Sequence, residues 1–112
     1  MSELRRHTRK QTSHRVIIFD LSSQESIGSL INISVSGLML MTDQKLHPGH
    51  IFQLEMTLPG QAGEMHTIAF GAESLWIQKI SSSDHSWVGL QIIDMAESDI
   101  ALIGQLIQDW KE

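Results

Sequence analysis

The 112-residue sequence contains no cysteine, no tyrosine and only 2 prolines. Without cysteine the chain forms no disulfide, and thiol catalysis and cysteine-ligated zinc are excluded. No hydrophobic run approaches the roughly 18 residues that predict a membrane span. The N-terminus is polar and basic, without the apolar segment of a signal peptide. We therefore expect a cytoplasmic protein of one domain that is not inserted in a membrane.

Positive charge is scarce beyond residue 15. Five of the 8 Lys and Arg residues lie in the first fifteen positions, where Glu3 alone opposes them, so this segment carries +4. The other 97 residues hold three cations and twelve acidic residues, a net charge of −9. An acidic body with 5% aromatic residues is a poor binder of single-stranded or duplex nucleic acid, so we expect no such partner. The basic segment either binds a compact anion or remains a solvated tail.

Short apolar segments recur at roughly ten-residue spacing and are separated by turn residues, which is typical of an all-β barrel or sandwich. Residues 1–13 hold only Met1 and Leu4 as apolar residues, so we expect a flexible basic arm there and the folded domain over 14–112. The six predicted strands cover residues 16–21, 26–33, 37–42, 51–56, 65–80 and 87–93.

The C-terminal segment has a helical pattern instead. Asp94 to Glu97 has the spacing of a capping box, with Asp94 in the capping position. Gly104 weakens the helix by roughly 1 kcal/mol relative to alanine, so packing against the barrel must hold it. The apolar positions that follow helical spacing are Ile100, Ile103, Leu106, Ile107 and Trp110.

Two short motifs carry candidate chemistry. Arg5 and Arg9 form Arg-x-x-x-Arg, and residues 32–37 read Asn-x-Ser-x-x-Gly. The arginine fork matches the O6 and N7 acceptors of guanine, and it also pairs with phosphates. Asn32 and Ser34 offer an amide and a hydroxyl, while Gly37 allows close backbone approach or a positive φ. Each motif alone is common, the first in basic tails and the second in ordinary turns.

No set of residues indicates catalysis or metal binding. Ser34 lacks the Gly-x-Ser-x-Gly environment of a nucleophile. The acidic residues are scattered and form no convincing acid–base pair. His47 and His50 have no third ligand close in sequence. We therefore expect neither an enzyme nor a metal or cofactor site.

The two motifs, in this order with a strand between them, give the chain its resemblance to the PilZ domain family of bacteria. That resemblance implies a six-stranded antiparallel barrel with a C-terminal α-helix, and cyclic di-GMP as the ligand. Arg5, Arg9, Asn32, Ser34 and Gly37 match the family's motif in full. Arg6 is carried over as the second arginine that often follows the first. Trp76 is carried over because some relatives place a late-strand tryptophan beside a guanine.

Single-domain members of this family typically act as adaptors, in which the ligand orders the arm and changes the surface shown to a protein partner. The resemblance therefore implies a cyclic-di-GMP-binding regulatory receptor with a downstream protein partner. Leu4, directly before the motif, favours one ligand molecule per site. The alternative is a protein-interaction adaptor that keeps the barrel, binds no nucleotide and uses its basic arm on an acidic partner.

Overall fold

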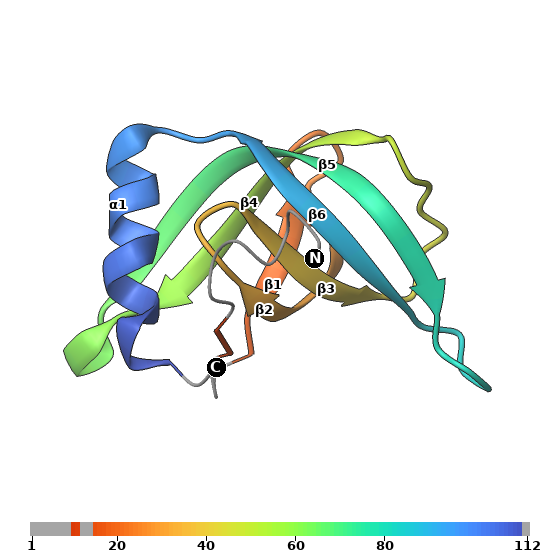
Figure 1. The fold of residues 1–112 in the computed structure, drawn as a ribbon, viewed down its shortest axis with the longest axis horizontal. Helices are drawn as coiled ribbons and strands as arrows, with labels where there is room; N and C mark the ends of the chain where they lie inside the picture. Colours follow the sequence, from red (N-terminus) through yellow and green to blue (C-terminus); the bar gives the residue numbers. More distant parts are fainter. Residues whose placement is uncertain (1–9, 12–14, 111–112) are drawn as a thin grey trace, which may run out of the picture.

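The computed structural model describes residues 10–11 and 15–110. Six antiparallel strands form a closed barrel in the order β1-β2-β3-β6-β5-β4 (Figure 1). This confirms the predicted fold and all six predicted strands, with shifts of a few residues at their ends. The strands are β1 (Ile17–Asp20), β2 (Glu25–Ile33), β3 (Gly37–Thr42), β4 (Ile51–Pro59), β5 (Met65–Lys79) and β6 (Ser86–Asp94).

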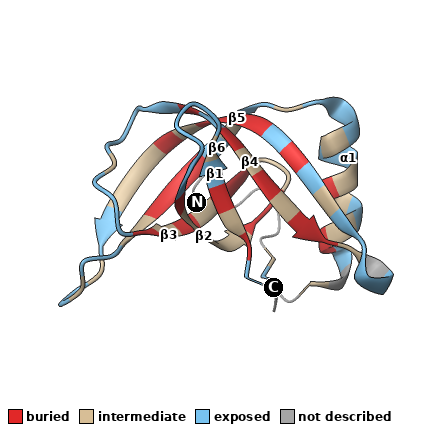
Figure 2. Cartoon of the chain, turned by 180° about the vertical axis from the view of Figure 1, so that it is seen from behind, coloured by how far each residue is buried: buried red, intermediate tan, exposed pale blue. Residues whose placement is uncertain are grey.

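Alternation of buried and exposed side chains explains why these segments are strands. In β3, Leu38 and Leu40 are fully buried, whereas Met39 between them is only partly buried. The same period-two pattern runs through β4 and the first part of β5, where Figure 2 shows it as alternating colours. One face of each strand therefore fills the barrel and the other covers its outside.

Four shifts of register interrupt the strand pairing. One lies between β1 and β2, one between β2 and β3, and two between β5 and β6. Bulges of this kind bend a strand and increase its twist, which helps six strands close into a barrel. Strand β5 is long enough to pair with β4 over its first half and with β6 over its second half.

The helix α1 (Glu97–Leu106) follows β6 and leads into a short 3-10 helix (Ile107–Asp109). The predicted capping box is wrong. Asp94 is the last residue of β6 and pairs with Gly71, so its backbone is held in the sheet. The N-cap residue is Ala96, which makes no side-chain capping bond; its carbonyl accepts the N–H groups of Asp99 and Ile100.

The helix packs on the barrel mainly through its second half. Ile103 and Ile107 belong to the buried core, and Leu106 and Trp110 pack against it. Ile100 was expected on this face but is 37% exposed, so the packed face begins after the first helical turn. No helix among residues 15–110 has the length and apolar character needed to cross a membrane.

Candidate functional site

The turn between β2 and β3 is built around Ser34. Its N–H donates to the carbonyl of Gly37 at 2.8 Å, and its hydroxyl accepts from the N–H of Ser36 at 3.3 Å. The hydroxyl also lies 3.4 Å from the Gly37 carbonyl oxygen. Ser34 is 0% exposed. The Ser34 hydroxyl therefore provides an acceptor for the Ser36 N–H inside the turn.

The same turn is tied to β6. Gly37 pairs with Gln91, and the Ile92 N–H donates to the Ser36 carbonyl at 2.9 Å. Of the two roles predicted for Gly37, positive φ is wrong: within residues 15–110 the glycines with positive φ are Gly49 and Gly63. Gly37 has ordinary strand backbone because it opens β3.

Lys10 joins the N-terminal segment to this part of the barrel. Its N–H donates to the Ile33 carbonyl at 2.9 Å, and its carbonyl accepts the Ile33 N–H at 3.0 Å. These two bonds form an isolated antiparallel bridge at the end of β2. The residue after Arg9 in sequence is thus fixed beside Asn32. Arg5, Arg6 and Arg9 themselves lie outside the described residues.

One row of paired residues runs across four strands, with Asn32 at one end and Trp76 at the other. Asn32 of β2 pairs with Met39 of β3, Met39 with Gly89 of β6, and Gly89 with Trp76 of β5. The neighbours of Met39 and Gly89 within their strands, such as Leu38 and Leu90, are fully buried. The row therefore lies on the outside of the barrel.

Two bulges place the ends of this row on the outer face. In β2, Leu30 faces Leu40 and Asn32 faces Met39, so Ile31 is an extra residue. In β5, Ser74 faces Leu90 and Trp76 faces Gly89, so Leu75 is an extra residue. Strict alternation would put Asn32 on the same face as Leu30, and Trp76 on the same face as Ser74. Each bulge reverses that alternation.

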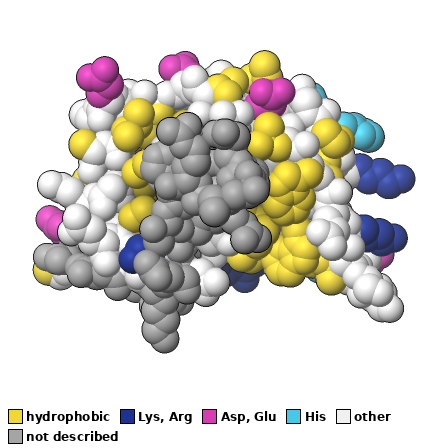
Figure 3. Space-filling model, in the orientation of Figure 1, with side chains coloured by type: hydrophobic (Ala, Val, Ile, Leu, Met, Phe, Trp, Pro, Cys, Tyr) yellow, Lys and Arg dark blue, Asp and Glu magenta, His cyan; other side chains and the backbone are white. Residues whose placement is uncertain are grey.

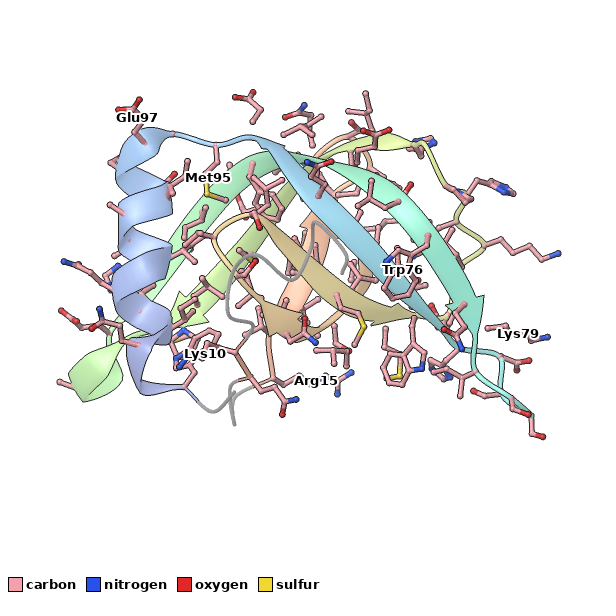
Figure 4. The ribbon with its side chains drawn as sticks, in the orientation of Figure 1. Lys10, Arg15, Trp76, Lys79, Met95 and Glu97 are labelled. Carbon is pink, nitrogen blue, oxygen red and sulfur yellow. The ribbon has the colours of Figure 1, made fainter. Side chains whose placement is uncertain are left out.

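The indole of Trp76 lies against the backbone of Gly89. A β-carbon added at Gly89 would be 2.2 Å from Cε2 and 2.3 Å from Nε1 of this ring. Figure 4 shows Trp76 lying across β6 on the outside of the barrel. The missing side chain at Gly89 makes room for the ring, which is half-buried. An aromatic face held in this way offers a stacking surface to a planar ligand.

Apolar side chains of β3 and β6 lie along this row and were not predicted to take part in the site. We call Met39, Met41 and Trp87 the apolar floor. Met39 and Met41 of β3 alternate with buried leucines, and Met41 pairs with Trp87 of β6. Figure 3 shows hydrophobic side chains gathered over β3 and β6. The sequence signal was the Leu-Met-Leu-Met alternation in residues 38–41, which puts both methionines on the outer face once the leucines are assigned to the core.

A hollow of about 540 Å³ adjoins this floor at Met41. Arg15, just before β1, lines this hollow with a positive charge. Glu25 and Asp43 line it with negative charges. The described residues include no group of three or more His, Asp and Glu able to hold a metal ion. The other lining residues are Ile17, Ser26, Ile27, Gly28, Ser29, Gln44 and His85.

The predicted site residues thus fall into three groups. Asn32 and Trp76 are at the two ends of one outer row. Ser34 and Gly37 build the turn that follows Asn32. The arginines belong to the undescribed segment that ends at the Lys10 bridge. Whether these residues contact a ligand stays a prediction.

Solved structures with this fold include three from bacteria. The inhibitor of motility MotI/DgrA of Bacillus subtilis has a TM-score of 0.77 and 17% identity, over 96% of this chain and 50% of its own. The PilZ domain of Escherichia coli YcgR with c-di-GMP has a TM-score of 0.66 and 18% identity, over 92% of this chain and 88% of its own. YcgR in complex with c-di-GMP has a TM-score of 0.70 and 18% identity, over 92% of this chain and 44% of its own.

These likenesses establish the fold, and the chain spans only about half the length of MotI/DgrA and of the longer YcgR structure. A sequence search of curated proteins gives no match. The family described as PilZ domain matches residues 3–109, which is nearly the whole sequence. The chain therefore belongs to the PilZ domain family.

Proposed function

We propose that this protein is a cyclic-di-GMP receptor that acts as an adaptor rather than as an enzyme. The observation that carries the proposal is the Lys10–Ile33 bridge, because it ends the arginine-bearing segment next to Asn32. In this proposal the two halves of the sequence motif, more than twenty residues apart in the sequence, meet at one place on the barrel. Two of the structural neighbours, the PilZ domain of YcgR and the longer YcgR structure, contain c-di-GMP, which supports the choice of ligand.

In this proposal each part of the site binds a different part of the ligand. The Asn32 amide hydrogen-bonds a guanine edge, and the Trp76 ring stacks on a purine face beside the apolar floor. Arg5, Arg6 and Arg9 pair with guanine and phosphate from the other side. Ser34 and Gly37 hold the turn in shape, and the Ser34 hydroxyl reaches the ligand if it exchanges one of its turn contacts.

The proposed switch is the ordering over the barrel of the part of the arm that precedes Lys10, whose backbone is already bonded to Ile33. The ligand neutralises the arm's positive charge and contacts both the arm and the outer row, so it stabilises only the closed arrangement. The surface presented to a downstream protein then differs between the two states. Leu4 favours one ligand molecule in each site.

Calorimetric titration of the purified chain with cyclic di-GMP tests the proposal. We expect saturable binding at one ligand per chain, with affinity falling as salt rises because charge-assisted contacts are screened. Amide chemical-shift mapping should show the largest changes at Asn32, Gly37 and Gly89 and at the Trp76 indole. Absence of heat at tens of micromolar ligand would contradict the proposal and favour the nucleotide-independent adaptor.

The Lys10 bridge gives a more local prediction. Lys10→Pro removes the N–H that donates to Ile33, so the arm loses one of its two backbone bonds to β2. We expect about a 5- to 10-fold weaker affinity for cyclic di-GMP, corresponding to roughly 1 kcal/mol for one hydrogen bond.

Lys10→Ala is the matched control, since it removes the same side chain and keeps both backbone bonds. The barrel should unfold at the same denaturant concentration in both variants. Equal affinities of the proline and alanine variants would show that the bridge does not position the arm.

A further inference from the structure

A second surface of the barrel carries a cluster of exposed apolar side chains. Four of the six large hydrophobic side chains that the structure describes as exposed belong to it. Phe19 belongs to β1, and Leu21 directly follows that strand. Ile51 begins β4, and Ile93 lies at the end of β6. Ile51 is 60% exposed and Ile93 is 47% exposed. We call these four residues the acidic-edged patch.

The pairing of the strands brings Leu21 and Ile93 to the same part of the sheet, across Gln53 and Gly71. The Leu21 N–H donates to the Gln53 carbonyl at 2.8 Å, and Gln53 pairs with Gly71 of β5. A β-carbon at Gly71 would lie 3.4 Å from the Gln53 amide nitrogen and 3.7 Å from Cγ1 of Ile93. Side chains from β4 and β6 therefore meet over Gly71. Exposed apolar side chains gathered in one part of a surface mark an interaction site, whereas single exposed side chains do not.

Negative charge borders the patch. Glu55 pairs with Phe19, Glu73 pairs with Ile51, and Asp94 pairs with Gly71. The four Lys and Arg side chains that the structure describes come from other places: Lys10, Arg15, the loop holding Lys45, and Lys79 at the end of β5. Figure 3 shows acidic and hydrophobic side chains along the upper edge of the molecule, with basic ones elsewhere on that face.

This combination of apolar centre and acidic border selects the partner. A second copy of the chain would bring a like-charged border against this one, and an anionic membrane or nucleic acid would be repelled. We propose that the acidic-edged patch docks a protein segment whose apolar side chains are flanked by Lys and Arg. The proposal rests on the adaptor part of the proposed function and does not require the ligand to bind here.

The patch is also joined to the turn of the candidate ligand site. Ile93 directly follows Ile92, whose N–H donates to the Ser36 carbonyl in that turn. Glu73, on the border of the patch, pairs with Gln91, and Gln91 pairs with Gly37. A ligand that changed the turn would therefore act on backbone that continues into the docking surface.

The test uses the full isotope-labelled chain and a synthetic amphipathic helical peptide of leucines flanked by lysines. We expect amide shifts at residues 19–21, 51–53, 71 and 91–94. The double variant Ile51→Ser/Ile93→Ser should weaken peptide binding at least 10-fold. Glu55→Lys/Glu73→Lys should weaken it similarly and favour a matched peptide in which glutamates replace the lysines.

Met65→Ser is the control, because Met65 is 58% exposed and lies outside the patch. The affinity of this variant for the peptide should stay within twofold of wild type. Shifts spread over the other acidic surfaces, or equal losses in the control, would overturn the proposal. Dimers that disappear in Ile51→Ser/Ile93→Ser would also overturn it by assigning the patch to a second copy. The patch variants should keep wild-type titration with cyclic di-GMP, so failure of ligand binding and failure of docking are observed separately.

Discussion

Replacing Arg9 with alanine should weaken cyclic-di-GMP binding by roughly 30- to 5,000-fold, which corresponds to about 2–5 kcal/mol. Arg9 directly precedes Lys10, whose backbone is bonded to Ile33, and in the proposed function it reaches the ligand from there. Removal of its guanidinium would leave a ligand phosphate or guanine edge without its charged partner in a partly desolvated site. We expect a loss in the same range for Arg5→Ala. Calorimetric titration at fixed salt measures both.

The loss of affinity should depend on the position and the shape of the arginine side chain rather than on the total charge of the protein. Lys45→Ala removes one positive charge from the loop between β3 and β4, away from the motif, and should bind like wild type. Arg9→Lys keeps the charge but loses the fork, so its affinity should lie between those of wild type and Arg9→Ala. None of these variants should change the free energy of unfolding measurably. Wild-type affinity in both alanine variants would mean that the arm does not hold the ligand.

The barrel could be predicted because burial follows a period of two over most of its length. Residues such as Leu38, Leu40 and Leu54 alternate with partly exposed neighbours, and the turn residues between strands are those that turns require. The helix was found for a similar reason, its 3.6-residue period. Its start was predicted wrongly because the pairing of Asp94 with Gly71 outweighs the local capping pattern.

The geometry of the site could not be read from periodicity. Asn32 and Trp76 are outward-facing only because Ile31 and Leu75 are extra residues in their strands. A bulge is a property of two paired strands, so one strand's sequence does not reveal it. The contact between Trp76 and Gly89 could not be predicted for the same reason. The residue at position 89 must be small because the ring of Trp76, from the neighbouring strand, lies against it. The sequence motif identified several of the candidate residues, whereas the pairing across the sheet determined which of their side chains face outward.

Gly28→Ala should cause a large loss of stability without touching the proposed ligand contacts. A β-carbon at Gly28 would be 2.4 Å from the Met41 carbonyl oxygen and 2.8 Å from Cδ1 of Leu40. The oxygen belongs to the backbone of β3 and cannot rotate away, so the β2–β3 pair must separate. We expect about 2–3 kcal/mol of destabilisation, the range for inserting atoms into a packed region. Urea unfolding of the purified variant measures it.

Gly104→Ala is the informative comparison because the same chemical change has the opposite expected sign. A β-carbon there would meet only Cγ1 of Val35, at 3.8 Å, which is ordinary contact. Alanine also restricts the unfolded chain and suits the interior of α1, so the variant should gain about 0.5–1 kcal/mol. The free energies of unfolding of the Gly28→Ala and Gly104→Ala variants would then differ by roughly 3 kcal/mol, although each adds one methyl group. A neutral Gly28→Ala would show that β2 and β3 do not approach as closely as described, and the placement of Asn32 beside Met39 would lose its support.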